Sequence, residues 1–427
     1  MNDVWIVSVV FILTYFLIAN EKIKITKPTA ALSGAMLIIA LKVISQKEAV
    51  SYIDFNTIGL LIGMMIIVNV IKKTGLFQYL AIKAVKLADG EPTKIMISFA
   101  LITAISSSLL DNVTTVLLIA PVTIVISDTL KINPIPFLMT EILLANIGGT
   151  ATMIGDPPNV MIGSSTNLSF LDFVINLAPI VIIIIGISVF MLRFIYKKEL
   201  EVSEEIKSKV DKFDESKAIK DKKLLYQSLF ALSLTITGFI FHNLIDIETA
   251  SIALTGAAFL MLISDVWPEH IYQDIEWKTI FFFAGLFILV GGLEKVGLLD
   301  KLAQLTISFT KGHYVLTALF LLWISAIAST IIDNIPFVAT MIPLIHSIDK
   351  VMGGGFSVEP LWWALSLGAC LGGNGSLIGA SANVVVSGIA EKNDYDISFK
   401  SYLKIGFPIM IVSIFIASIY LYFRYLN

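Results

Sequence analysis

Cysteine, histidine and charge are scarce in this chain of 427 residues. It contains one cysteine and four histidines, and charged side chains make up only 15% of it. A single cysteine excludes an intrachain disulfide and a Cys-rich metal cluster. Soluble domains average about 25% charged residues, so much of this surface faces something other than water. The net charge of −3 gives no indication of a nucleic-acid partner.

Long apolar segments fill the chain instead. Hydrophobic residues make up 56% of it, and its mean hydropathy is +0.87. A spanning helix needs about 20 mainly apolar residues. Such segments lie near residues 4–20, 29–45, 57–71, 172–195, 225–241, 250–264, 279–293 and 403–423. The sequence therefore predicts an all-α, multi-pass protein of the plasma membrane.

Four further apolar stretches are interrupted. Two of them, 95–127 and 315–348, carry an Asp-Asn pair in the middle, and two others, 136–165 and 361–390, contain Gly-rich or Pro-rich runs. We interpret the first two as re-entrant hairpins and the other two as broken helices. The prediction is about ten spanning helices plus two hairpins.

A polar stretch, 196–224, divides the chain into two parts, 1–195 and 225–427. It contains nine lysines and is too short and too charged to form a domain, so we read it as a solvated linker. The positive-inside rule places it in the cytoplasm. With five crossings on either side, both termini are then predicted outside.

The two parts repeat each other. Pairs separated by 222 residues are Gly34 and Gly256, Thr57 and Thr279, Gly63 and Gly285, Gly75 and Gly297, Asp111-Asn112 and Asp333-Asn334, and Pro121 and Pro343. Farther along, Gly148-Gly149 matches Gly372-Gly373 and Asn159 matches Asn383, both at 224. An odd number of crossings in each part turns the second upside down, as in the inverted repeats of secondary transporters.

The broken helices hold a dense set of small and polar residues. Irregular backbone survives at membrane depth only where it is buried in protein or lines a cavity. Its free N–H groups can hold an anion, and its free carbonyls can hold a cation. The predicted binding residues are Asn146, Gly148, Gly149, Thr150, Thr152, Asp156 and Asn159 in the first break, and Gly373, Asn374, Ser376, Ser381 and Asn383 in the second.

The hairpin tips carry ionisable residues. Their predicted binding residues are Ser107, Ser108, Asp111, Asn112 and Thr114 in the first tip, and Asp333 and Asn334 in the second. A charged residue inside the membrane is costly and marks a functional site by default. We expect Asp111 and Asp333 to exchange a proton for a cation or substrate. The alternative is that each caps the helix that follows it.

Two acidic residues occur in the first half only. Asp156 and Glu141 stand where the second half has Ala380 and Leu365. Asp156 is either a site residue or a cap of the half-helix after it. Glu141 is either a proton relay or a snorkelling residue at the end of its helix. Cys370 is read as a small packing residue.

These motifs resemble the ion transporter superfamily. The Asp-Asn tips and the two breaks, Gly-Gly-Thr-Ala-Thr-Met-Ile-Gly-Asp-Pro-Pro-Asn and Gly-Gly-Asn-Gly-Ser-Leu-Ile-Gly-Ala-Ser-Ala-Asn, look like its arsenite-efflux and sodium–proton antiporter branch. They are also similar to the melanosomal P protein and to citrate-transporter-like permeases. The resemblance implies an elevator mechanism and a homodimer with a scaffold built from the helices at 29–45, 57–71, 250–264 and 279–293.

The function that follows is secondary active transport of a small inorganic ion or oxyacid, of the arsenite or antimonite type, coupled to protons or sodium. Sodium–proton antiport, an anion conductance and a sodium-coupled dicarboxylate or citrate carrier are alternatives. Dicarboxylate carriers of the superfamily have Ser-Asn-Thr at each tip, whereas Asp111 and Asp333 here would repel a dianion unless protonated. No enzymatic residue set, resident metal or cofactor is predicted beyond the coupling ion.

Overall fold

The protein is described here from a computed structural model that places residues 2–20, 23–200, 215–352 and 357–426. All of its regular structure within these ranges is helical. The first half contains α1 (Asn2–Ala19), α2 (Lys27–Ala40), α3 (Gln46–Tyr52), α4 (Phe55–Lys73), α5 (Leu76–Leu87), α6 (Pro92–Leu109), α7 (Asn112–Leu130), α8 (Ile135–Gly149), α9 (Pro157–Ser165) and α10 (Phe170–Ile195).

The second half repeats this series helix by helix. After the short 3-10 helix η2 (Glu215–Lys217) come α12 (Lys222–Ile245), α13 (Thr249–Ile263), α14 (Pro268–Gln273), α15 (Trp277–Lys295), α16 (Leu298–Phe309), α17 (Tyr314–Ile331), α18 (Asn334–Met352), α19 (Glu359–Gly372), η3 (Gly373–Gly375), α20 (Ser381–Glu391), α21 (Phe399–Leu421) and η4 (Tyr422–Leu426). Adding 222 to both bounds of α4 gives 277 and 295, the bounds of α15. The same sum converts α5, α6 and α7 into α16, α17 and α18.

Local sequence explains where these helices begin and end. Gly75 and Gly297 adopt positive φ angles of 82° and 69°, a conformation that only glycine enters without strain, and so allow the turn into α5 and α16. Pro157 opens α9, because a proline at the first helical position gives up no hydrogen bond. Asp54 caps α4 by accepting bonds from the N–H groups of Asn56 and Thr57.

Two ion pairs establish that the halves are inverted. Lys73, at the end of α4, lies 3.0 Å from Asp274, just before α15 begins. Lys295, at the end of α15, lies 2.6 Å from Glu48, in the short helix that precedes α4. The end of each helix therefore lies beside the start of the other, and the equivalent helices α4 and α15 run antiparallel.

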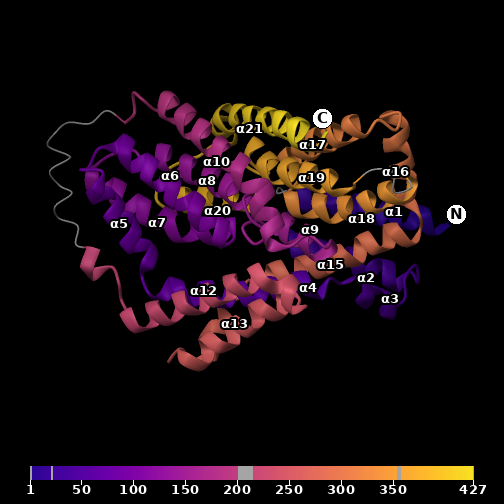
Figure 1. The fold of residues 1–427 in the computed structure, drawn as a ribbon, viewed down its shortest axis with the longest axis horizontal. Coiled ribbons are helices and arrows are strands. Elements are labelled where there is room, and N and C mark those ends of the chain that lie inside the picture. Colours follow the sequence, from indigo (N-terminus) through magenta and orange to yellow (C-terminus); the bar gives the residue numbers. More distant parts are fainter. Residues whose placement is uncertain (1, 21–22, 201–214, 353–356, 427) are drawn as a thin grey trace.

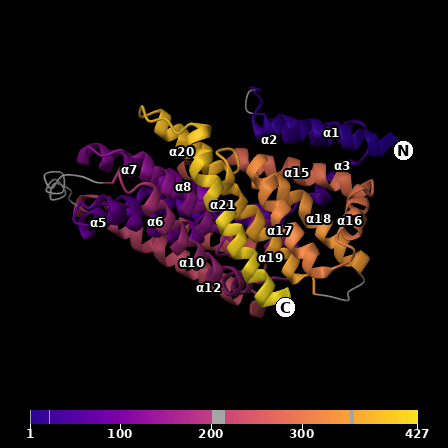
Figure 2. The ribbon, with the colours of Figure 1, turned by 90° about the horizontal axis from the view of Figure 1, so that it is seen from above.

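The arrangement in space follows from this inversion. Figure 1 and Figure 2 both place the equivalent helices α5 and α16 at opposite ends of the longest axis. In the described ranges, nine helices are long and apolar enough to cross a membrane, and four of them, α6, α7, α17 and α18, form the two hairpins. With the shorter apolar helices α1, α2, α8 and α13, the predicted all-α, multi-pass fold is confirmed.

Close helix packing holds the frame helices together, a name we give to α1, α2, α4, α12, α13 and α15. A Cβ added to Gly63 of α4 would lie 2.5 Å from the backbone of Ala253 in α13. One added to Gly285 of α15 would lie 2.7 Å from the backbone of Ala31 in α2. Small residues permit such contact in membrane proteins. The core helices, α6 to α9 and α17 to α20, include both hairpins and both breaks.

Candidate functional site

Each hairpin tip is fastened to the break of its own half. The Ser107 hydroxyl donates to the Ala145 carbonyl at 2.7 Å, and the equivalent Ser329 hydroxyl donates to the Ala369 carbonyl at 2.7 Å. In return, Thr152 donates to the Ser108 carbonyl and Ser376 to the Thr330 carbonyl, both at 2.5 Å. The two tips are thus brought to the middle of the broken helices, which supports the hairpin interpretation.

Asparagine amides satisfy the carbonyls that each break sets free. Asn159 donates to the carbonyls of Thr150 and Thr152, at 3.1 and 2.9 Å. Asn383 donates to those of Gly373 and Ser376, at 2.8 and 2.9 Å. A buried carbonyl without a partner costs about 1–3 kcal/mol. Both asparagines therefore stabilise the breaks.

The two halves join through a cluster of buried amides. Asn146 donates to the side-chain oxygens of Asn374 and Asn383, both at 2.8 Å, and accepts from Asn112 at 3.1 Å. Asn374 in turn donates to the Leu143 carbonyl at 3.1 Å. Because every partner is buried, the cluster fixes the position of one break relative to the other.

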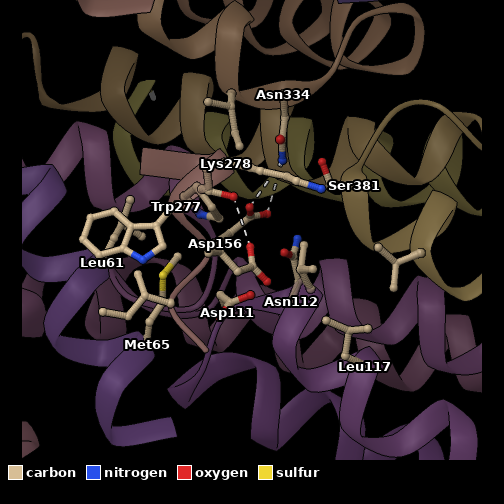
Figure 3. Close-up of a pocket in the computed structure, with 17 residues that line it drawn as sticks. Leu61, Met65, Asp111, Asn112, Leu117, Asp156, Trp277, Lys278, Asn334 and Ser381 are labelled. Atoms are coloured by element: carbon tan, nitrogen blue, oxygen red, sulfur yellow. Dashed lines mark hydrogen bonds between the residues drawn. The ribbon is translucent and has the colours of Figure 1, made fainter. Parts of the chain in front are cut away.

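A cavity of about 550 Å³ opens where the tips meet the frame helices. Figure 3 shows Asp111 and Asn112 on one side, Asn334 and Ser381 on the other, and Asp156 between them. The frame contributes Leu61 and Met65 of α4 and the segment 275–279. Five predicted site residues line this cavity, namely Asp111, Asn112, Asp156, Asn334 and Ser381.

Asp156, which lines this cavity, is fully buried. It stands immediately before α9, but its side chain makes no capping hydrogen bond there. Its two carboxylate oxygens instead lie 3.3 and 3.5 Å from the amide nitrogen of Asn334, at the tip of the opposite hairpin. Of the two alternatives for Asp156, the geometry favours a site residue.

Asp111 caps the helix that follows it. Its carboxylate accepts from the backbone N–H of Thr114 at 2.7 Å and from the Thr114 hydroxyl at 2.5 Å. The capping alternative is therefore correct, and the same carboxylate also lines the cavity. Both of these bonds stay within its own hairpin.

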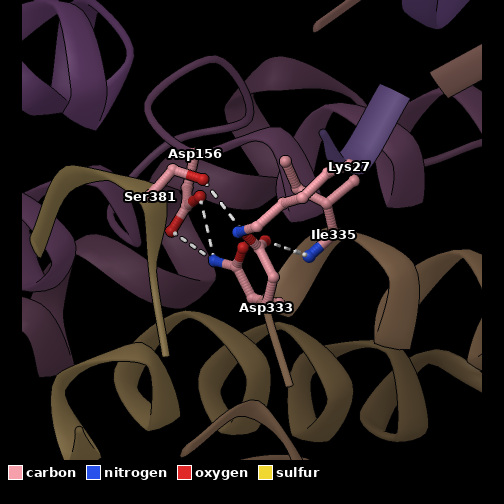
Figure 4. Close-up of polar contacts among 6 residues, drawn as sticks. Lys27, Asp156, Asp333, Ile335 and Ser381 are labelled. Atoms are coloured by element: carbon pink, nitrogen blue, oxygen red, sulfur yellow. Dashed lines mark hydrogen bonds and ion pairs between the residues drawn. The ribbon is translucent and has the colours of Figure 1, made fainter. Parts of the chain in front are cut away.

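Asp333 has different partners from its counterpart. Its carboxylate lies 2.7 Å from the Lys27 ammonium and accepts from the Ser381 hydroxyl at 2.9 Å and from the Ile335 N–H at 3.2 Å. Figure 4 shows Lys27 and Ser381 reaching it from separate elements. The Lys27 ammonium therefore lies at the tip of the second hairpin.

Glu141 lies inside the core helices. It is fully buried in α8, one of its oxygens accepts from the Thr123 hydroxyl of α7, and the other has no hydrogen-bond partner. The snorkelling alternative is therefore wrong, since a snorkelling side chain keeps its head in water. The proton-relay alternative stays a prediction.

The other predicted residues lie behind the cavity wall. Ser108 donates to the Ile105 carbonyl, and Thr150 donates to the Asn146 carbonyl. Gly148 allows close contact with the backbone of Ala104, and Gly149 and Gly373 face Gly155 and Gly379. Ser107, Thr152, Asn159, Asn374, Ser376 and Asn383 hold the breaks as described above. Thr114 bonds Asp111.

Two charged residues of the cavity were missed from the sequence. Glu276 and Lys278 line it from the start of α15, and Glu276 accepts from the Thr279 hydroxyl at 3.0 Å. The signal was available in the repeat, because Asp54 and Thr57 stand 222 residues earlier and make the equivalent bond. With Asp111, Asp156 and Glu276 facing one Lys278, the described lining is mainly acidic.

A second cavity, of about 570 Å³, is related to the first by the repeat. It is lined by Ile53, Asp54 and Phe287, the counterparts of Ile275, Glu276 and Met65. The tip aspartates are absent from its described lining. The inverted repeat therefore builds two similar cavities, and only the first contains the tip residues.

Comparison with known proteins places this geometry in a family. Residues 15–368 match the family model described as a citrate transporter. The chain belongs to the citrate transporter family. An uncharacterized transporter of Mycobacterium tuberculosis is 44% identical over 420 residues, which cover 97% of each chain. A 46 kDa membrane protein of Mycobacterium leprae is 42% identical over 421 residues, or 98% of each.

More distant relatives agree with the fold. The P protein of Sus scrofa is 34% identical over 501 residues, covering 98% of this chain but 59% of that protein. The Alcanivorax borkumensis YdaH transporter, whose crystal structure has an unusual topology, matches 87% of this chain and 86% of its own, with a TM-score of 0.58 at 14% identity. The expected resemblance to the ion transporter superfamily is confirmed, and the family is one of transporters rather than enzymes.

Proposed function

We propose that this protein is a secondary active transporter that couples a proton or sodium ion to the movement of a small anion or oxyacid. The first cavity is the binding site, and Asp111, Asp156 and Asp333 carry the coupling cation. The observation that carries the proposal is the meeting of both tips and Asp156 at one cavity.

The charge of the cavity narrows the substrate class. The carboxylates of Asp111, Asp156 and Glu276 line it, and the one ammonium of the described lining, that of Lys278, offsets only part of their charge. A fully ionised tricarboxylate would be repelled unless cations entered with it or the aspartates were protonated. A neutral oxyacid such as arsenite, or an anion accompanied by cations, suits this lining. Ligation of arsenic by thiolates does not suit this site, because Cys370 is buried and its thiol is directed at the Asn159 side chain.

Sodium–proton antiport is the second candidate, and the acidic excess of the lining favours it. Carboxylate oxygens are ligands for hard cations and for protons alike. In that case Asp111 and Asp156 would exchange the two cations, with no separate anion in the cycle.

Flux into proteoliposomes separates these functions. We would impose a pH gradient or a sodium gradient and follow arsenite, citrate, chloride and sodium in turn. Accumulation of arsenite or citrate against its own gradient supports the first function. Sodium movement against its gradient with protons alone supports the second. Flux that only dissipates every gradient contradicts both and indicates a conductance.

The elevator and the homodimer belong to the same proposal. The core helices, with both tips, would move against the frame helices and expose the site alternately to the two cavities. Large apolar side chains stay exposed on α1 and α12, including Trp5, Phe16, Tyr226 and Leu244, whereas α4 and α15 are mostly buried inside the protomer. A dimer would therefore use the outer frame helices more than α4 and α15.

A further inference from the structure

Lys27 is the first residue of α2, and it forms an ion pair with a nearly buried partner. The Asp333 side chain is 2% exposed, and the Lys27 ammonium lies 2.7 Å from one of its oxygens. The Ser381 hydroxyl and the Ile335 N–H complete the shell of donors around this carboxylate (Figure 4). In this conformation a protein cation therefore neutralises Asp333.

The equivalent site around Asp111 has no such lysine. The residue that corresponds to Lys27 is 27 + 222 = 249, a buried threonine at the start of α13. The residue that corresponds to Asp333 is Asp111, whose described side-chain bonds go only to Thr114 of its own helix. The repeat makes Asp111 and Asp333 equivalent, but only Asp333 is paired with a lysine side chain in the described residues.

The stability of α2 does not explain this lysine. A cation in the first turn of a helix is disfavoured by the helix dipole, by about 0.3–1 kcal/mol when exposed. A buried carboxylate, in contrast, needs a charged partner to offset its desolvation. Lys27 therefore serves to stabilise the Asp333 carboxylate. The ion pair links a frame helix to the hairpin tip of the core helices.

We propose that Lys27 is a tethered cation, which occupies at Asp333 the position that a free coupling ion takes at the first-half carboxylates. This inference rests on the proposed cation coupling. The other charged groups near the tip are Asp156, held through Asn334, and Asp111, Glu276 and Lys278 across the cavity. When the core moves away from the frame, the pair separates, and Asp333 takes a sodium ion or proton until Lys27 returns.

Thermal unfolding of the purified full-length protein tests the tether without any transport substrate. The test variant is Lys27→Thr, which copies residue 249. Its melting temperature should rise more steeply with sodium chloride than that of the wild type, relative to choline chloride at equal ionic strength, because a ligand of the native state stabilises it. If a proton replaces the lysine instead, the variant should lose more stability than the wild type as pH rises through neutrality.

Three variants make the result specific. Lys27→Arg keeps a cation and should behave as the wild type, and Lys24→Thr removes an exposed lysine from the same loop and should have no effect. Lys27→Thr combined with Asp333→Asn should lose the new ion dependence. If Lys27→Thr does not fold, recovery of folding by sodium or by Asp333→Asn supports the tether.

The tether is overturned by either of two results. One is a Lys27→Thr variant whose sodium and pH dependence equals that of the wild type, or whose new dependence persists after Asp333→Asn is added. The other is a Lys27→Thr variant that fails to fold under all of these conditions. Failure of the proposed function has a separate signature, because wild-type proteoliposomes would then show no flux driven by a proton or sodium gradient.

Discussion

The two halves of the chain share their supporting bonds but differ in their charges. Ser107 and Ser329 bond equivalent carbonyls at the same 2.7 Å. Asn159 and Asn383 likewise donate to the equivalent carbonyls of Thr152 and Ser376, both at 2.9 Å. By contrast, three charged residues have uncharged counterparts in the second half. Asp156 corresponds to Ala380, Glu141 to Leu365 and Lys27 to Thr249.

This difference separates structure from chemistry. An inverted repeat must break one helix in each half, so the bonds that support a break occur twice. A coupling reaction needs charge at defined places, and nothing requires those places to be symmetric. Residues that break the symmetry at the cavity are therefore candidates for chemistry alongside the tip aspartates, and the predictions below test residues that the halves share and residues that they do not.

The largest expected effect comes from the two tip aspartates, a charged pair that the repeat preserves. Asp111→Asn and Asp333→Asn should each abolish flux driven by a pH gradient, because an amide cannot exchange a proton for a cation. Asp333→Asn should also lower stability, since it breaks the ion pair with Lys27. Proteoliposome flux and thermal unfolding measure the two effects.

The two variants, Asp111→Asn and Asp333→Asn, should differ in their stability. Asp111→Asn keeps its amide oxygen as a cap for Thr114 and leaves no lysine behind, so it should be the more stable variant. Unchanged pH-driven flux in both variants would contradict the coupling mechanism.

Asp156 tests the first asymmetry. Asp156→Asn should weaken binding more than it alters the pH dependence, because the amide still faces Asn334 without the charge. Loss of a hydrogen bond to a charged group costs about 1.5–3 kcal/mol, or roughly 10- to 150-fold in affinity. The apparent KM for the transported ion is the measurement, and a KM equal to that of the wild type would exclude Asp156 from the binding site.

The sequence predicted the architecture well for a physical reason. A fixed 222-residue offset through glycine, proline and Asp-Asn pairs defines equivalent helices whatever their apolar content. The search for long apolar segments, in contrast, missed α3, α5, α14 and α16, which are too short or too polar for a hydropathy criterion.

Side-chain partners were harder to predict. The sequence could not pair Lys27 with Asp333, because the two residues are 306 positions apart, one on a frame helix and the other at a tip of the core helices. Most polar residues of the breaks were predicted as ligands, whereas Asn159 and Asn383 bond the breaks' own carbonyls. Polar residues at a broken helix serve either purpose, and only the directions of the side chains distinguish them.

The supporting asparagines should both affect stability, Asn159 the more strongly. Asn159→Ala leaves the Thr150 and Thr152 carbonyls without this donor, at about 1–3 kcal/mol apiece. Asn383→Ala removes the side-chain donor of the Gly373 carbonyl, whereas the Ser376 carbonyl keeps its bond from the Gly379 N–H. We expect losses of about 2–6 kcal/mol for Asn159→Ala and about 1–3 kcal/mol for Asn383→Ala, measured by thermal unfolding. Ser165→Ala, near the end of α9, removes a part-buried hydroxyl and serves as the control. A smaller loss in Asn159→Ala than in Asn383→Ala would contradict this account of the breaks.

Glu141 tests an asymmetry inside the core helices. The second half has Ile345 and Leu365 where the first has Thr123 and Glu141, and both replacements are fully buried. Thr123→Ile combined with Glu141→Leu should stabilise the protein by about 1–3 kcal/mol, because it removes a buried oxygen without a partner. Thermal unfolding measures this gain, and flux shows whether it costs activity. Destabilisation would mean that the unpartnered oxygen is satisfied by a bound ion.

The smallest expected effect concerns the reciprocal ion pairs that mark the inversion. The hydrogen bond from Lys295 to Glu48, helped by the Ser45 N–H and hydroxyl, lowers the Glu48 pKa from 4.5 to about 2. A lowered pKa stabilises the fold above the unfolded value and loses this contribution as pH falls from 4.5 toward 2. Glu48→Gln should therefore melt slightly below the wild type at neutral pH and converge with it in acid. Lys295→Met should remove the same increment, and the double variant should show no further loss. A difference that persists unchanged in acid would show that Glu48 acts through the Ser45 cap rather than through its charge.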